Sequence, residues 1–384
     1  MAQKQTELTQ LLDFGREMPP DSRILVAMSG GVDSALTAVL LRRAGIECVG
    51  INMRTYHPTA EDVQSGRKFQ TCCSPEDAGD ARAVALDEDF PFYVLDLEKQ
   101  FHQAVVEPFI NEYLRGRTPN PCVLCNNHLK LGLLIDKARL YGCDFVATGH
   151  YARIVENTAS GRMEMHRAAD PGKDLTYYLF GLRQDQLRRF LCPLGGMTKP
   201  QVRELAREYG ISVAEKPDSM EICFVPGNDY RKFLQKRVGE GAIAPGNIVT
   251  TDGRVVGRHE GIACYTVGQR KGLGITSAVP LYVIDILAEE NLVVVGPAEQ
   301  TTSPGLVCSR MNWVAIEEPT AELRTTAQIR YRHRPAACTV RPLGAGRFQV
   351  EFDDPQRSIT PGQAVVFYDG ESVLGGGWID QRLS

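Results

Sequence analysis

Short apolar runs alternate with longer segments of helical periodicity in the first part of the chain. The apolar runs with the length of buried strands are Ile24–Met28, Cys48–Met53, Tyr93–Leu97 and Asp144–Thr148. Helical periodicity is found over Ala35–Arg43, Glu98–Leu114 and Leu129–Leu140, and after the helix-opening residues Ser74-Pro75-Glu76-Asp77. Strands that alternate with helices pair in parallel through right-handed crossovers. The pattern therefore predicts an α/β fold, an open parallel sheet with helices on both faces.

Shorter β-like runs dominate the rest of the chain. Ala152–Val155 and Met163–Ala168 come first, and a helix follows that Thr198 should cap and Gly210 should end. From about Gly227 the sequence is rich in glycine, and short strands are predicted around Ile248, Ile262 and Tyr282–Ile286. After Pro304 only strand-like pieces follow, among them Ala327–Tyr331, Cys338–Arg341, Phe348–Phe352 and Ala364–Tyr368. The turn residues between them have the spacing of a small barrel or sandwich.

The composition is that of a globular protein with more than one domain. A chain of 384 residues exceeds the ~100–200 residues usual for one domain. Hydrophobic residues make up 43% and charged residues 23%, which excludes disorder as the main state. No apolar run approaches the ~18 residues of a membrane helix, and residues 1–20 lack the features of a targeting peptide. We therefore expect a cytoplasmic protein with no membrane partner.

Net charge and cysteine content indicate which functions the protein could have. In a cytoplasmic protein the 11 cysteines are expected as reduced thiols, some of them functional, and not as a disulfide framework. The net charge of −4 argues against a protein that coats nucleic acid through bulk charge, but it allows a local basic face.

The segment Ser29–Ser34 reads Ser-Gly-Gly-Val-Asp-Ser and lies between the first predicted strand and the first predicted helix. Adjacent glycines let the backbone approach a polyanion, and the following helix offers unpaired N–H groups. Asp33 would repel a bare phosphate, so its presence points to a Mg²⁺ ion on a pyrophosphate. The spacing matches neither a Walker loop nor a dinucleotide-binding loop. A glycine-rich turn that binds nothing is the alternative.

This hexapeptide resembles the PP-loop of ATP pyrophosphatases, which cleave ATP between the α and β phosphates and adenylate an oxygen of their substrate. The resemblance implies that the phosphates are held by Ala27, Met28, Ser29, Gly30, Gly31, Val32, Asp33 and Ser34. Met53 and Gly149, at the ends of the second and fourth predicted strands, would then flank the adenosine at the carboxyl edge of the sheet.

A pair of cysteines follows a predicted helix start. If Asn120 caps the helix and Pro121 is its first residue, Cys122 and Cys125 lie on one face near the positive end, which favours the thiolate. Two cysteines are too few for zinc, although Cys72-Cys73 could complete a site. Two buried, inert thiols are the other alternative.

Cys223 stands where the polar stretch that begins at Asp218 passes into an apolar run, and it is a candidate partner for Cys125. The cysteines that lie in or beside apolar runs and are expected only to pack are Cys48, Cys143, Cys192, Cys264, Cys308 and Cys338.

Together these motifs resemble the MnmA-type tRNA-specific 2-thiouridylases over almost the whole chain. The matching blocks are Ser29–Ser34, Cys73–Asp77, Thr118–Asn126, Ala147–Tyr151, Asp218–Phe224, Tyr265–Ile275 and Ile329–Arg332. The resemblance implies a PP-loop ATP-binding catalytic domain over residues 1–224, a small central mostly-β domain over 225–300 and a tRNA-contacting C-terminal β-barrel over 301–384.

The resemblance also implies a reaction. ATP would adenylate O2 of the wobble uridine, U34, and a persulfide on Cys223 would attack C2 and expel AMP, giving 2-thiouridine and pyrophosphate. Cys125 would then act as a nucleophile that resolves the persulfide. The sulfur would come from a persulfide donor such as a cysteine desulfurase or a sulfur-relay protein.

One position departs from the family pattern, because Cys122 stands where many members have an acidic residue. Cys122, Cys125 and Cys223 could therefore hold a 4Fe-4S cluster through three thiolates. The persulfide and cluster alternatives both remain open at the level of the sequence.

The resemblance further implies where tRNA binds. Asn120, Pro121 and Cys122 would face the target base. The residues expected to touch tRNA are His150, Lys173, Asp174, Leu175, Arg330, Tyr331 and Gln363. Arg330 belongs to a basic cluster around Tyr331, which would attract phosphates and offer a stacking surface. The expected substrates are the tRNAs for glutamate, glutamine and lysine.

Two other functions are compatible with part of these motifs. A PP-loop ligase or amidotransferase that acts on a small molecule would explain Ser29–Ser34 but would give Cys125 and Cys223 no role. A non-catalytic, nucleotide-gated RNA-binding module would use the same loop without cleaving ATP. Release of pyrophosphate from ATP, and its dependence on tRNA or on a small molecule, distinguishes the three functions.

Overall fold

The computed structural model describes residues 12, 14–56, 74–218, 222–225, 227, 229–239 and 243–383. Its chain forms two compact units. The first contains residues 1–104, 122–228 and 370–373, and the second contains residues 105–121, 229–369 and 374–384. Within the described residues no helix is long and apolar enough to cross a membrane.

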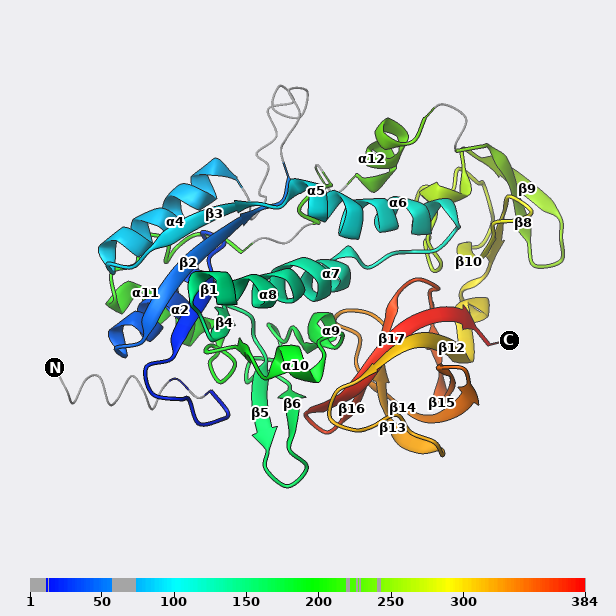
Figure 1. Cartoon of the computed structure of the whole chain (residues 1–384). Coiled ribbons are helices and arrows are strands. Elements are labelled where there is room, and N and C mark those ends of the chain that lie inside the picture. The colour runs from blue at the N-terminus through cyan, green and yellow to red at the C-terminus, as the bar shows by residue number, and fades with distance from the viewer. Residues whose placement is uncertain are drawn as a thin grey trace. The chain divides into compact units, whose positions relative to one another are not determined.

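The first unit is built on a five-stranded parallel sheet with the strand order β3-β2-β1-β4-β7 (Figure 1). Its strands are β1 (Arg23–Ala27), β2 (Glu47–Arg54), β3 (Phe92–Asp96), β4 (Phe145–Thr148) and β7 (Phe190–Leu191). A hairpin of β5 (Arg153–Asn157) and β6 (Arg162–His166) belongs to the same unit. The predicted open parallel sheet is confirmed.

Helices cover both faces of this sheet. The helices are α2 (Val32–Arg43), α4 (Pro75–Asp87), α5 (Glu98–Phe101), α7 (Pro121–Leu124), α8 (Leu134–Ala138), α9 (Thr176–Leu179), α10 (Gln184–Leu187) and α11 (Lys199–Glu208). Helices α2, α4 and α11 share one hydrophobic core with the sheet residues Ile24 and Val26. The intervening Leu25 is buried as well, because successive side chains of a strand point to opposite faces and α8 packs on the sheet through β4.

Sequence signals set the ends of these helices. Ser74 caps α4 as predicted: its hydroxyl accepts a hydrogen bond from the Asp77 N–H at 3.0 Å, and the Asp77 carboxylate accepts one from the Ser74 N–H at 3.4 Å. Gln201 likewise accepts a hydrogen bond from the Thr198 N–H at 2.8 Å, and Gly142 ends the segment after α8 with φ of +65°.

Two of the predicted helices contain π-helical turns. One π-helix covers His102–Val106, between α5 and α6 (Glu107–Leu114), and it ends just before Pro108, which has no N–H to donate to the preceding turn. The other covers Cys125–Leu133, between α7 and α8. A 3₁₀ turn, Arg139–Tyr141, follows α8.

The second unit contains a small sheet and a barrel. The small sheet has the order β10-β11-β8-β9, with strands β8 (Gly246–Thr250), β9 (Val255–His259), β10 (Tyr282–Leu287) and β11 (Leu292–Gly296). Ile248, Val283 and Val293 form its core. The helix α12 (Tyr230–Arg237) precedes it, and 3₁₀ turns cover Ile262–Cys264 and Ala298–Thr301. The strand predicted around Ile262 is therefore wrong, because Gly261, with φ of +146°, leads the chain into a tight turn there.

The C-terminal strands form a closed antiparallel barrel, as predicted. Its strands are β12 (Thr302–Trp313), β13 (Leu323–Gln328), β14 (Ala336–Gly344), β15 (Arg347–Arg357), β16 (Ala364–Asp369) and β17 (Ser372–Arg382). Pairing of β12 with both β15 and β17 closes the barrel. Its interior is filled by aromatic and branched side chains such as Phe348, Val350 and Phe367, each no more than 1% exposed.

Candidate active site

The loop from β1 to α2 is a compact turn at the carboxyl edge of the sheet. Ser34 Oγ accepts a hydrogen bond from the Ser29 N–H at 3.1 Å and donates one to the Gly31 carbonyl at 3.0 Å. Gly30 has φ of +73°, and a Cβ there would lie 2.2 Å from the Asp77 carbonyl oxygen. No side chain caps the start of α2, so its first N–H groups face outward where an anion could accept them.

Two lysines hold this loop in place. Lys199 Nζ lies 2.7 and 2.8 Å from the carboxylate oxygens of Asp33, and it also contacts Asp218 at 2.8 Å. Lys216 Nζ donates to the Gly30 carbonyl at 3.0 Å and is paired with Asp77 at 2.6 Å. Neither lysine is signalled by the sequence, because their contacts with the loop and with Asp77 join segments more than a hundred positions apart.

Asp33 was expected to bind a Mg²⁺ ion. The contacts of its carboxylate in the structure test whether it could do so. Lys199 compensates its charge, and Tyr151 donates a hydrogen bond to Asp33 Oδ1 at 2.8 Å. Burial raises the pKa of Tyr151, which keeps this phenol protonated as a donor. One carboxylate beside phosphate oxygens is a donor set that Mg²⁺ commonly uses in nucleotide sites. The residues present therefore fit a Mg²⁺ ion that arrives bound to a triphosphate.

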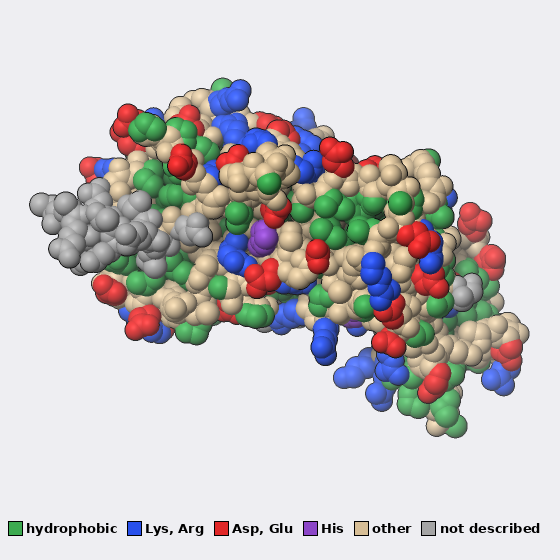
Figure 2. Space-filling model, turned by 90° about the horizontal axis from the view of Figure 1, so that it is seen from below, with side chains coloured by type: hydrophobic (Ala, Val, Ile, Leu, Met, Phe, Trp, Pro, Cys, Tyr) green, Lys and Arg blue, Asp and Glu red, His purple; other side chains and the backbone are tan. Residues whose placement is uncertain are grey.

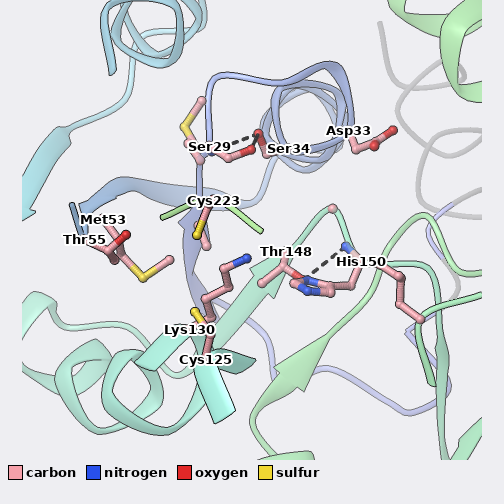
Figure 3. A pocket seen from close by; sticks show the side chains of 14 residues that line it. Ser29, Asp33, Ser34, Met53, Thr55, Cys125, Lys130, Thr148, His150 and Cys223 are labelled. Carbon is pink, nitrogen blue, oxygen red and sulfur yellow. Dashed lines mark hydrogen bonds between the residues drawn. The ribbon is translucent and has the colours of Figure 1, made fainter. Parts of the chain in front are cut away.

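A cavity of about 170 Å³ opens beside the loop (Figure 3). Its lining residues are Ala27, Met28, Ser29, Asp33, Ser34, Met53, Thr55, Cys125, Lys130, Thr148, Gly149, His150, Leu175 and Cys223. Cys125 and Cys223, far apart in the sequence, thus line the same space as the glycine loop. Gly30, Gly31 and Val32, predicted to hold phosphates, are not among its lining residues; Gly30 and Gly31 precede α2, and Val32 is its first residue.

Gly149 lets the end of β4 approach the start of α2. A Cβ at this position would lie 2.7 Å from the Asp33 carbonyl carbon, which leaves no room for any other residue without a shift of the backbone. The side chains of Met53 and Thr55 come from the end of β2, the neighbouring strand. The cavity therefore lies at the carboxyl edge of the parallel strands, where ligands of open α/β sheets bind.

The sequence reasoning missed Thr55, Lys130 and Thr148. Thr55 and Thr148 could have been found from their places at or just after the ends of the second and fourth strands. Lys130 could not, because helical spacing of three or four residues does not place it on the face of Cys125.

His150 is a neutral hydrogen-bonding residue at the wall of the cavity. Its Nδ1 lies 2.7 Å from Thr148 Oγ1, and its Nε2 lies 3.2 Å from Asn126 Oδ1. Burial, together with repulsion by Lys130, lowers the pKa of His150 to about 3. The imidazole is therefore uncharged near neutral pH, and it can contact a ligand only as a hydrogen-bonding group.

The cysteines divide into groups by their surroundings. Cys125 is 8% exposed and lines the cavity, whereas Cys122 is exposed and is not one of the lining residues.

Among the described residues no three His, Cys, Asp or Glu side chains are placed to hold a metal ion together. Cys122, Cys125 and Cys223 thus do not form the three-thiolate set that a 4Fe-4S cluster needs, and Cys72-Cys73, weighed for zinc, lies outside the described residues.

The remaining cysteines are packing residues, as predicted. Burial raises the pKa of Cys48 and Cys338 to about 12 and that of Cys143 to about 11. Burial also raises the pKa of Cys192, Cys264 and Cys308. These thiols stay protonated and inert near neutral pH.

The residues expected to touch tRNA in the first unit take different places. Lys173 pairs with Asp218, and Leu175 lines the cavity. Asp174 accepts hydrogen bonds from Arg167 at 2.7 Å and from the Thr176 hydroxyl at 2.9 Å, so its carboxylate orders the chain around it.

In the second unit, Arg330 is exposed and donates one hydrogen bond to the Arg357 carbonyl at 3.0 Å. The Arg332 guanidinium lies 5.3 Å from the ring centre of the neighbouring Tyr331. Gln363 donates its amide N–H groups to the carbonyls of Thr118 and Pro119 at 3.0 and 3.1 Å, next to the buried Asn120. Pro121 is the first residue of α7.

Fold and site together define a nucleotide-binding α/β protein with a thiol pair beside its glycine loop. Residues 22–227 match the family model described as "tRNA methyl transferase HUP domain", residues 231–297 the "tRNA methyl transferase PRC-barrel domain" and residues 303–379 the "Aminomethyltransferase beta-barrel domain". The first match alone covers more than half of the chain.

Curated relatives are more specific. The chain is 52% identical to a tRNA-specific 2-thiouridylase MnmA of Geobacter metallireducens, over 94% of this chain and 98% of the relative. It is 50% identical to the protein of the same name from Carboxydothermus hydrogenoformans, again over 94% of this chain and 98% of the relative. The chain belongs to the MnmA family of tRNA-specific 2-thiouridylases, which confirms the resemblance found in the sequence.

Proposed function

We propose that this protein is a tRNA 2-thiouridylase that uses ATP to replace the C2 oxygen of a wobble uridine with sulfur. The observation that carries the proposal is that one cavity is lined both by loop residues, among them Ser29 and Ser34, and by Cys125 and Cys223. A phosphate-binding loop beside two thiols suits a reaction that first activates an oxygen with AMP and then displaces it with sulfur.

In the first half-reaction the loop would bind ATP. The N–H groups at the start of α2 and the hydroxyls of Ser29 and Ser34 would hold the phosphates, with the adenosine against Met53 and Gly149. Asp33 is the carboxylate placed to meet a Mg²⁺ ion, which would offset charge on the departing pyrophosphate. The uridine O2 attacks the α-phosphorus, the bond to the β-phosphate oxygen breaks, and the products are adenylated uridine and pyrophosphate.

In the second half-reaction a persulfide on Cys223 would attack C2. The C2–O bond breaks, AMP leaves, and the uridine is joined through the transferred sulfur to Cys223. The Cys125 thiolate then attacks the Cys223 sulfur, which forms a Cys125–Cys223 disulfide and leaves the outer sulfur on C2 as 2-thiouridine. An external thiol reductant restores the two cysteines, and a persulfide donor such as a cysteine desulfurase or a sulfur-relay protein reloads Cys223.

Recognition of tRNA would involve both units. Asn120, Pro121 and Cys122 would face the target base, which must leave its stack to reach a buried cavity. The other proposed contacts are His150, Lys173, Asp174, Leu175, Arg330, Tyr331 and Gln363. Of these, Arg330 is the exposed cation suited to a backbone phosphate, whereas the neutral His150 suits a hydrogen bond to a base or ribose. The tRNAs for glutamate, glutamine and lysine are the proposed substrates, in the cytoplasm.

Mass spectrometry of tRNA nucleosides tests the proposal. Unmodified tRNA is incubated with the protein, Mg·ATP and a persulfide donor, and pyrophosphate is measured in the same samples. We expect 2-thiouridine together with pyrophosphate and AMP, all dependent on tRNA. Pyrophosphate release that needs a small amine or acid instead of tRNA would establish a ligase or amidotransferase, and release of ADP would exclude the adenylation step.

A further inference from the structure

Lys130 reaches the cavity because the helix that carries it is wound as a π-helix. In an α-helix, residues three or four positions apart share a face, so a residue five positions after Cys125 would point elsewhere. The segment Cys125–Leu133 instead has i→i+5 turns, which bring residues five positions apart one above the other. In Figure 3 the Lys130 ammonium group points into the same space as the sulfur atoms of Cys125 and Cys223.

Lys130 also supplies positive charge to the lining of this cavity. The described lining residues with ionisable side chains are Asp33, Cys125, Lys130, His150 and Cys223. The Asp33 carboxylate is already compensated by Lys199, which lies outside the lining. His150 is neutral, partly because Lys130 repels a proton there. Among these residues Lys130 is therefore the cation that faces the two sulfur atoms.

A cation beside a sulfur atom stabilises its anionic form. Both sulfur steps of the proposed reaction begin from an anion: the persulfide of Cys223 attacks C2, and the thiolate of Cys125 attacks Cys223. We propose that Lys130 is a further catalytic residue, whose ammonium group stabilises the anionic sulfur at Cys223 and Cys125. This inference rests on the proposed function. The phosphates of ATP are assigned to the glycine loop, so ATP affinity should not depend on Lys130.

Cysteine alkylation measures this role without tRNA or ATP. Reduced protein is treated with iodoacetamide at pH 7.5, and the rate at each cysteine is followed by peptide mass spectrometry. In Lys130→Met we expect Cys125 and Cys223 to react about threefold more slowly or worse, because loss of the cation raises their pKa. Exposed Cys122, three positions from Cys125 but outside the cavity lining, is the internal reference and should keep its rate.

Further variants separate charge from structure. Lys130→Arg keeps the cation and should alkylate within about twofold of the wild type, and Lys130→Gln is a second neutral variant should Lys130→Met fail to fold. Lys137→Met, on α8 of the same helical segment and not a lining residue, is the matched control. Formation of 2-thiouridine should fall about tenfold or more in the neutral variants, with the Kd for ATP unchanged.

Unchanged alkylation rates at both cysteines in folded, neutral variants would overturn the inference. So would a neutral variant that loses only ATP affinity, since Lys130 would then contact phosphate. The two proposals fail separately: a wild type that forms no 2-thiouridine contradicts the function, whereas thiolation that is equal in wild type and Lys130→Met contradicts the role of Lys130 alone.

Discussion

Cys125 and Cys223 are the residues on which the proposed sulfur transfer depends most directly. Replacing either with Ser should lower 2-thiouridine formation about 100-fold or more, because a hydroxyl cannot carry or release the sulfur. Pyrophosphate release should persist for a single turnover, because adenylation uses no thiol. Nucleoside mass spectrometry and a pyrophosphate assay on the same samples measure the two effects.

The control for these variants is Cys143→Ala. Cys143 is buried, lies outside the cavity lining and has a pKa raised to about 11, so its loss should leave thiolation within about twofold of the wild type. Full activity of both Cys125→Ser and Cys223→Ser would contradict the proposed sulfur path.

The partly buried His150 predicts a pH-dependence of stability. Its pKa in the folded protein, about 3, lies below the unfolded value of 6.5. Protonation therefore favours the unfolded chain, so the stabilisation is complete above pH 6.5 and is lost as the pH falls toward 3. Between about pH 7 and pH 5 the free energy of unfolding should drop by roughly 2 kcal/mol more in the wild type than in His150→Gln. Urea unfolding at both pH values measures this, and equal drops would contradict it.

Single residues show how far the sequence could predict the site. The place of Ser29, Asp33 and Ser34 in the cavity lining was predictable from local order, since the loop between a parallel strand and the following helix lies at the carboxyl edge of the sheet. Lys199 and Lys216 could not be predicted, because long side chains find their partners only when the fold is complete. From their spacing, Cys122 was expected to lie on the same helix face as Cys125. The structure places Cys122 outside the cavity lining.

At the scale of elements, the β1–α2 turn is the most tightly constrained feature. Gly30→Ala should weaken ATP binding about tenfold or more, because φ of +73° is strained for alanine and the new Cβ would lie 2.2 Å from the Asp77 carbonyl oxygen. Titration with ATP measures the loss.

Gly79→Ala, on α4, is the matched substitution. A Cβ at Gly79 meets nothing within 4 Å, so the variant should keep its ATP affinity and gain about 0.5–1 kcal/mol in the free energy of unfolding. An unchanged Kd for ATP in Gly30→Ala would show that the turn is not the phosphate site.

Elements bounded by strong local signals were predicted well, and elements shaped by tertiary contacts were not. The Ser74 cap and the Gly142 stop lie where the sequence puts them. The π-helix at Cys125–Leu133 has no local signal, although it brings Lys130 to the cavity. The strand β17 is rich in glycine and was not among the strands that we named, because glycine weakens strand propensity. Glycine allows a close contact here: a Cβ at Gly375 would lie 2.6 Å from the Asn312 carbonyl oxygen.

At the scale of the molecule, the fold class was predictable, but the individual strand pairs that close the barrel were not. Alternation of strands and helices determines a parallel sheet, whereas closure of the barrel needs β12 to pair with β17, far along the chain. The chain forms two compact units, each assembled from separate stretches of sequence. The three domains expected over residues 1–224, 225–300 and 301–384 stay a prediction. On the face drawn in Figure 2, basic and acidic side chains are interspersed, in keeping with the net charge of −4.

With a net charge of −4, attraction of tRNA depends on local cations, and Arg330 is the one that we propose on the barrel. Arg330→Ala should flatten the plot of log affinity for tRNA against log salt by about one unit of slope, since one phosphate contact releases about one counterion. The loss of affinity should therefore be largest at low salt, while the Kd for ATP stays unchanged. Arg324→Ala, which removes an exposed barrel cation already paired with Asp353, should change the slope less. Filter binding from about 50 to 200 mM salt measures both variants, and a loss of affinity independent of salt would rule out a phosphate contact at Arg330.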